Sequence, residues 1–176
     1  TLKIKVLTRL DGEKNNSAPN HVLKQLKDYK QPYNNNDELW MVVDRDGWGD
    51  CLIKAHADCL AAKFNIAVSA PCIELWFLLH VVDVSKYSEE EKKRININHK
   101  GYLKNKLKEE IQASRFFLSA DKGYSDRNPN TKRFMPQTEV AIERDKLLDT
   151  EEGNYPEFLG THVYKLIEKL LSDDIG

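Results

Sequence analysis

The sequence predicts an α/β domain with a small parallel sheet flanked by helices and a helical C-terminal elaboration. Strand and helix patterns alternate in the first half of the chain, and helical patterns alone accumulate in the second. A chain of 176 residues, 40% hydrophobic and 31% charged, can bury a core as one ordinary globular domain. We therefore expect a single domain over residues 1–176, with residues 83–176 as its helical elaboration.

The first predicted elements are a strand and a helix. Residues 2–7 alternate apolar and basic side chains before turning apolar, which is typical of a strand. Because the chain begins almost inside this strand, we expect that an upstream strand is missing. Ser17 is the predicted N-cap of the helix and Pro19 lies in its first turn. The inner face of this helix is predicted to contain Val22, Leu23, Leu26 and Tyr29.

The most strand-like segment covers residues 38–43 and ends at Asp44-Arg45-Asp46-Gly47. Its run from Leu39 to Val43 is continuously apolar, as expected when helices cover both faces of a parallel strand. The predicted elements that follow are a helix over about residues 50–64, a strand over 66–68, a break at Ser69-Ala70-Pro71 and a mostly buried helix over 72–82.

The second half predicts helices joined by polar segments. Ser88 and Glu91 have the spacing of a capping box at a helix start. The other predicted features are an apolar stripe of Leu103, Leu107 and Ile111 that Phe117 or Leu118 extends, a mobile polar loop over 123–136, and helices over 139–148 and 161–171. Thr161 is the expected N-cap of the last helix, and a helix N-terminus can also bind phosphate.

Composition and cysteine use limit the protein class. The 27 Lys and Arg residues against 28 Asp and Glu give a net charge of −1, which argues against a polybasic nucleic-acid binder. The three cysteines show no metal-binding spacing and are expected to be buried thiols. The longest apolar stretch, residues 75–82, is too short to span a membrane. A cytoplasmic location without membrane contact is expected.

Asp44 and Asp46 are the sharpest chemical signal. Two carboxylates that flank one residue at the end of a buried strand lie where open α/β sheets gather ligands. Oxygen ligands of this kind suit Mg²⁺ or Mn²⁺, with water and substrate phosphate completing the shell. The alternative is that Asp44 caps the following helix while Asp46 and Gly47 form a turn, and the sequence leaves both interpretations open.

A second group of polar residues follows the next predicted strand. Glu74 lies in an otherwise apolar helix, where it either binds or orients a metal ion or is satisfied by an internal Arg or a backbone amide. His80, in the same helix, is either a hydrogen-bonded core histidine or a contact to substrate. Lys100 and Lys104 could bind phosphate or form a solvated basic face. The more weakly indicated contacts to phosphate or a polyanion are Tyr102, Arg127, Lys132 and Arg133.

Three segments together resemble the RloB-like family. Residues 38–46 are similar to its strand followed by D-x-D, and residues 160–167 to its C-terminal S-T-x-V-x-x-L segment. Residues 69–80, which read SAPCIELWFLLH, are similar to its S-N-P-x-F-E-x-W-L-L-x-H signature. Ala70 and Ile73 replace the asparagine and the phenylalanine of that signature.

The resemblance implies a TOPRIM-like fold and a metal-dependent nuclease of bacterial anti-phage defence, cutting RNA (including tRNA) in preference to DNA. The family is associated with abortive-infection loci that also encode an ABC- or AAA-type ATPase. By position, Asp44 and Asp46 become metal ligands and Glu74 a third catalytic acid. His80 and Thr161 become residues beside the site, which together with Lys100 and Lys104 are the predicted substrate contacts.

One family feature is not found in this sequence. RloB-like proteins open with an E-G-x-x-E-like segment, whereas here Asp11-Gly12-Glu13 follows what corresponds to the second strand. This difference favours an alternative function, a non-catalytic module that docks on a partner ATPase. A phosphate-binding regulatory domain without an ATPase partner is a third alternative.

Overall fold

The computed structural model describes seven stretches of the chain. They are residues 3–7, 18–29, 37–45, 47–116, 125, 130–149 and 154–174. Asp46, Ser17, Phe117, Leu118 and Arg127 lie outside these stretches, and so do the predictions made for them.

The described sheet has three strands in the order β1-β2-β3, and β2 is its central strand. β1 (Trp40–Asp44) pairs in parallel with β2 (Asn65–Ala70), and β2 pairs antiparallel with the short β3 (Gly160–Thr161). The predicted α/β class and the parallel pair are confirmed, and β3 makes the sheet mixed. β3 lies within the region predicted to be a helical elaboration, so that region also contributes to the sheet.

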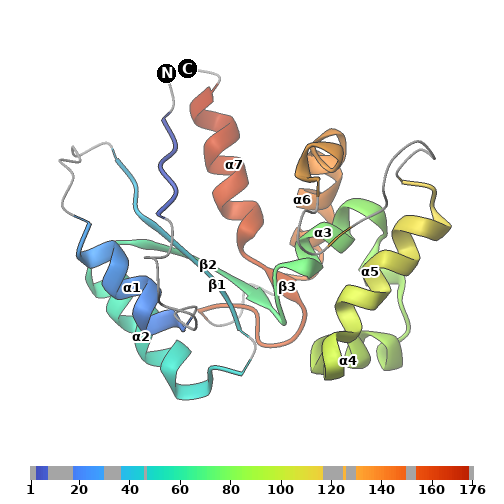
Figure 1. The fold of residues 1–176 in the computed structure, drawn as a ribbon, viewed down its shortest axis with the longest axis horizontal. Coiled ribbons are helices and arrows are strands. Elements are labelled where there is room, and N and C mark those ends of the chain that lie inside the picture. The colour runs from blue at the N-terminus through green and yellow to red at the C-terminus, as the bar shows by residue number, and fades with distance from the viewer. Residues whose placement is uncertain are drawn as a thin grey trace.

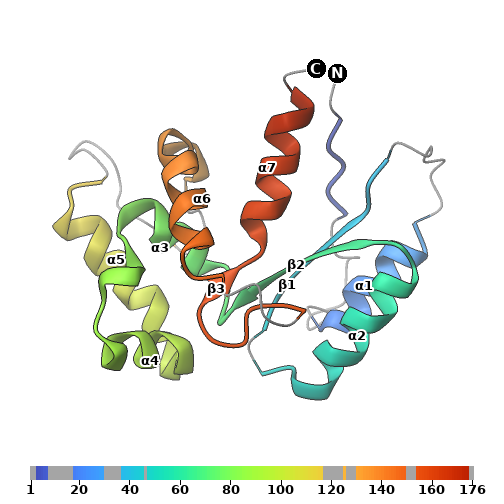
Figure 2. The same ribbon diagram turned by 180° about the vertical axis from the view of Figure 1, so that it is seen from behind.

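Helices gather at the two ends of the sheet (Figures 1 and 2). At one end, α1 (Pro19–Lys27) and α2 (Gly49–Ala61) pack with β1 around buried residues such as Leu23, Met41 and Leu52. The helices at the other end are α3 (Glu74–Val81), α4 (Glu89–Ile97), α5 (Tyr102–Ala113) and α6 (Thr138–Lys146). α7 (Val163–Asp174) packs against β2 and α6.

Short 3₁₀ helices connect the second group of helices. They are η1 (Val84–Lys86), η2 (His99–Gly101), η3 (Thr131–Arg133) and η4 (Met135–Gln137). The core of this group contains Leu75, Leu78, Leu79, Ile95, Leu103, Leu107 and Ala141, all fully buried. The predicted capping box is confirmed in its first half, because the Ser88 hydroxyl accepts a hydrogen bond from the Glu91 N–H at 3.2 Å.

Two strand predictions need correction. Residues 3–7 form no strand, and Ile4 and Val6 are 66% and 73% exposed, so their alternation does not lead to pairing within the described sheet. The apolar run of β1 is not covered on both faces, because Val42 is 43% exposed while Met41 and Val43 are buried. The last four residues of β2, the central strand, are all buried. β1 lies at the edge of the described sheet and pairs there only with β2.

Smaller predictions differ in detail. The N-cap of α1 is Ala18, with Pro19 in the first turn as predicted. The end of the predicted mobile loop is instead folded as η3 and η4, and Phe134 within it is buried against the Phe77 and Phe116 rings. All three cysteines are unbridged thiols, with Cys59 and Cys72 buried and Cys51 partly buried. Over the described residues, no helix is both long enough and apolar enough to cross a membrane.

Candidate functional site

Asp44 ends β1 and binds the start of a helix that comes much later in the chain. Its Oδ1 accepts a hydrogen bond at 2.8 Å from the N–H of Ile73, directly before α3. The parallel register explains this contact, because Asp44 lies opposite Ser69 and the chain leaves β2 at the same edge to enter α3. The alternative in which Asp44 caps the following helix is therefore wrong: it satisfies the beginning of α3, not of α2.

Glu74 is the first residue of α3 and its side chain is only 12% exposed. Its Oε1 lies 3.2 Å from Nζ of Lys104, which comes from α5 and is 45% exposed. From the sequence, the expected structural partner of this acid was an internal arginine or a backbone amide. The ion-pair partner is a lysine, one of the two that the sequence analysis named as phosphate contacts.

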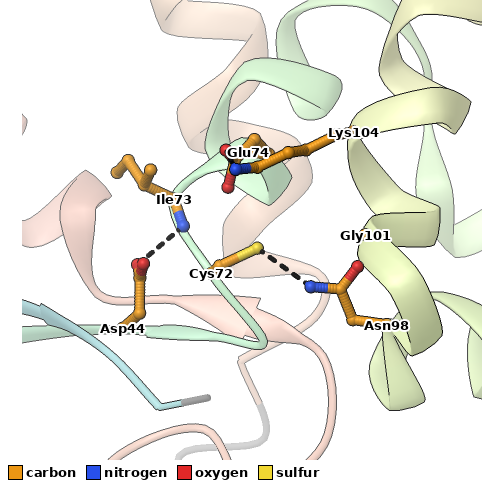
Figure 3. Close-up of a pocket in the computed structure, with 7 residues that line it drawn as sticks. All are labelled: Asp44, Cys72, Ile73, Glu74, Asn98, Gly101 and Lys104. Carbon is orange, nitrogen blue, oxygen red and sulfur yellow. Dashed lines mark hydrogen bonds and ion pairs between the residues drawn. The ribbon is translucent and has the colours of Figure 1, made fainter. Parts of the chain in front are cut away.

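These residues meet at one pocket of about 260 Å³. Figure 3 shows Glu74 and Lys104 reaching toward each other from α3 and α5, with Asp44 pointing at Ile73 beside them. The pocket is lined by Asp44, Cys72, Ile73, Glu74, Asn98, Gly101 and Lys104. One wall is the junction of β1 with α3 and the other is the start of α5, so the pocket joins the sheet to its helical elaboration.

Asn98 holds the second wall in place. Its backbone is left-handed, with φ of 49°, and ends α4. Its side-chain amide donates to Sγ of Cys72 at 3.5 Å, and its carbonyl oxygen accepts from the N–H of Leu103 at 3.0 Å. Burial, together with the charges of Glu74 and Asp44, raises the pKa of the Cys72 thiol, so this side of the pocket offers a neutral sulfur.

Arg45 fixes the segment after β1 to two distant parts of the chain. Its guanidinium donates to the carbonyl oxygens of Glu157 and Phe158, the latter at 3.2 Å, and to Oδ1 of Asn96 at 2.7 Å. It therefore ties the residue after Asp44 to α4 and to the approach to β3. In the sequence, Arg45 stands out only as the residue between two acids, and no local pattern indicates these contacts.

The other predicted site residues are spread over different environments. Lys100 is exposed next to Gly101, and its backbone is left-handed with φ of 51°. Thr161 is buried beside Ser69 at the end of β3, and its hydroxyl accepts from the N–H of Val163 at 2.9 Å. Because α7 begins at Val163, its N-cap position is His162, one residue after the predicted N-cap Thr161. Asp46 lies outside the described residues.

His80 lies in the core rather than at the pocket. It is 4% exposed, its Nδ1 is 2.8 Å from the carbonyl oxygen of Trp76, and its ring packs edge-on against Trp76 and Phe134. Burial lowers the pKa of His80, which favours the neutral ring. The geometry matches the core histidine that sequence analysis left open, and gives its predicted contact to substrate no support.

The donor groups of the pocket suit a hard, water-rich cation. Mg²⁺ is usually held by one or two carboxylates, with water and substrate phosphate filling its other positions. Asp44 and Glu74 supply two such groups, and the buried Ser69 hydroxyl beside Asp44 has no hydrogen-bond partner in the described structure. No three His, Cys, Asp or Glu side chains among the described residues are grouped closely enough to cage an ion. These residues fit a weak, open magnesium site rather than a closed one.

A family model described as RloB-like protein matches residues 2–170. This chain belongs to the RloB-like family. The match covers β1, the pocket and β3, so every described residue of this RloB-like site lies inside it. Comparisons of the RloB-like chain with curated proteins and with solved structures gave no match.

Proposed function

We propose that this RloB-like protein is a Mg²⁺- or Mn²⁺-dependent nuclease that cuts RNA, including tRNA, in preference to DNA, as the effector of a bacterial anti-phage system. The observation that carries the proposal is the meeting of Asp44 and Glu74 at one pocket, from segments 30 positions apart in the sequence. A structural acid needs only one partner, whereas two acids and a lysine around a common opening provide the charges that phosphodiester chemistry uses.

Each residue of the pocket has a separate role in this proposal. Asp44, oriented by its bond to the Ile73 N–H, and Glu74 would hold the cation, with Asp46 as a further predicted ligand. Lys104 would contact the phosphate of the substrate. When bound, the cation would activate water and stabilise negative charge on the phosphate. The bond between Asn98 and Cys72 keeps the wall that bears Lys104 close to the acids.

Cleavage assays with the full-length gene product test the proposal. Total tRNA and plasmid DNA are incubated with Mg²⁺, Mn²⁺ or chelator, using wild type, Asp44→Asn and Glu74→Gln. Asp58→Asn and Glu143→Gln are matched controls, because both acids are exposed on other helices. We expect metal-dependent cutting of RNA that both pocket variants lose and both controls keep. Cutting that survives in the pocket variants would assign the activity to another site or a contaminant.

A second candidate function is a non-catalytic module that docks on the ABC- or AAA-type ATPase of its locus. The favouring observation is that both pocket acids already have structural partners, the Ile73 N–H and Lys104. Co-expression with that ATPase tests this function. A complex that forms equally with wild type and Asp44→Asn, combined with no cutting by either protein in the presence of the ATPase, would replace the nuclease proposal.

A further inference from the structure

The ion pair across the pocket has unequal halves. Glu74 is the first residue of α3 and 12% exposed, so its carboxylate has little water to stabilise its charge. Lys104 is 45% exposed and reaches Glu74 at 3.2 Å from the opposite wall. The lysine therefore balances the charge of a largely buried acid while its own ammonium keeps access to water.

A divalent cation and the Lys104 ammonium would compete for the same carboxylate. Opposite charge stabilises an ionised acid, and two cations that share it repel each other at short range. The lysine has a flexible four-carbon stem, so its ammonium can turn away while its backbone stays in place. The backbone of α5 is anchored on each side of Lys104 by the fully buried Leu103 and Leu107.

We propose that Lys104 is a built-in counter-ion: it neutralises Glu74 in the cation-free protein, yields this acid to the incoming divalent cation, and then turns its ammonium to the substrate phosphate. This inference rests on the proposed metal-dependent function. It adds that the pocket is stabilised in the absence of metal, and that cation binding and phosphate binding are linked through one side chain.

Lys106, two positions further along α5, forms ion pairs that lie outside the pocket. Its Nζ lies 2.9 Å from Oε1 of Glu110 and 3.8 Å from Oε1 of Glu91. The side chain is 19% exposed and does not line the pocket. Its ammonium also lies 5.2 Å from the centre of the Tyr87 ring. Because the two lysines share a helix and a charge, Lys106 provides a matched control.

The first experiment measures Mn²⁺ affinity by calorimetry in the full-length protein without nucleic acid. Removing the competitor in Lys104→Gln is expected to tighten binding by about three- to fivefold, the upper part of the range for an exposed ion pair. Lys104→Arg keeps the charge and should bind within about twofold of wild type. Lys106→Gln should also stay within that range, because its partner acids lie outside the pocket.

The second experiment follows the lysine itself by reductive methylation and mass spectrometry. Mn²⁺ should increase labelling of Lys104 relative to Lys106, and a short RNA added afterwards should reduce it again. Affinity unchanged in Lys104→Gln, or raised equally in Lys106→Gln, would overturn the counter-ion role while leaving the metal site intact. Failure of wild type and Lys104→Gln alike to bind Mn²⁺ would instead overturn the proposed function on which the inference rests.

Discussion

Two carboxylates of this protein make the same hydrogen bond in opposite surroundings. Asp44 accepts from the N–H of Ile73 and Asp145 accepts from the N–H of Thr161, each at 2.8 Å. Asp44 lines a solvent-accessible pocket, whereas Asp145 is fully buried and burial raises its pKa to about 8. The two carboxylates therefore share the same type of hydrogen bond and differ in their access to solvent, which a ligand or substrate at the pocket would need.

The neighbours of the two acids differ in the same way. Beside Asp44, Glu74 is paired with one half-exposed lysine. Beside Asp145, the partly buried Asp149 accepts from the Tyr164 hydroxyl at 2.7 Å, and its Oδ2 lies 3.3 Å from Nζ of Lys165. The two lysines are equally exposed, Lys165 at 44% and Lys104 at 45%, so the two sets differ in their access to the pocket rather than in their ion pairs. We expect substitutions at the pocket to change activity, and substitutions at the buried acid to change stability.

The largest expected effect is a difference in cleavage activity between Asp44→Asn and Asp145→Asn. Asp44→Asn should reduce metal-dependent cleavage by about a hundred- to a thousandfold, because it removes a charged ligand. Asp145→Asn should leave cleavage within about twofold, since its carboxyl does not line the pocket. Initial rates and calorimetric Mn²⁺ titrations measure both variants. A comparable loss of activity in Asp145→Asn would show that the two acids act together.

The next effect is a pH dependence of folding that Asp145 imposes. Its pKa of about 8 in the folded protein lies above the ordinary value of 3.8, so the folded state holds a proton that the unfolded state releases between these values. The stability that this proton provides is complete below about pH 4 and is lost as pH rises toward 8, by at most about 1.4 kcal/mol per pH unit.

Urea unfolding between pH 5 and 8 measures this slope in wild type and Asp145→Asn. The asparagine keeps an oxygen for the Thr161 N–H but cannot titrate, so the difference between the two proteins isolates Asp145. The slope should remain in Asp44→Asn, where Asp145 is intact. Parallel pH profiles for wild type and Asp145→Asn would contradict a raised pKa at this acid.

A smaller effect is expected at Arg45, which links the pocket to α4 and to residues 157–158. Lys in its place cannot reach three acceptors in a fork, so Arg45→Lys should cost about 1 kcal/mol of unfolding free energy. Hydrogen exchange should rise at residues 96–101 and not within α2. Arg94→Lys, at a 57% exposed position of α4, is the control and should stay within about 0.5 kcal/mol of wild type. Equal losses of unfolding free energy in both variants would show that the contacts of Arg45 stabilise the fold no more than those of Arg94.

Local patterns predicted most of the fold, and the failures come from tertiary context. The apolar run of β1 and the capping residue Ser88 act through near neighbours, so the sequence indicates them directly. The two-residue strand β3 is too short to create an alternating pattern. Phe134 lies in a polar segment, and its burial depends on aromatic partners on α3 and after α5 that sequence spacing does not reveal.

The residues of the candidate site also divide into those that local sequence patterns indicate and those that depend on tertiary contacts. Asp44 and Glu74 stand out in sequence because each is a charge next to or within an apolar run, and the structure brings both to one pocket. Asn98 and Gly101 were missed as site residues. In a sequence, Asn and Gly beside a helix indicate only where the helix ends. They lie close to Cys72 because α5 packs on α3. Proximity across 26 positions is a tertiary property that one sequence does not contain.

The smallest expected effect tests whether the strained backbone beside the pocket serves binding. Lys100 has φ of 51°, a conformation that costs a side-chain-bearing residue about 1 kcal/mol and glycine almost nothing. After the entropy that glycine loses on folding, Lys100→Gly should stabilise the protein by about 0.5 kcal/mol. Lys100→Gln keeps the strain and removes the charge, so it should leave stability unchanged.

If Lys100 contacts phosphate, both variants should bind RNA about two- to fivefold more weakly and with a smaller salt dependence. Fluorescence anisotropy at two salt concentrations measures the RNA affinity and its salt dependence. Weaker binding in Lys100→Gly alone would assign the effect to the backbone, and unchanged binding in both variants would show that Lys100 makes no phosphate contact.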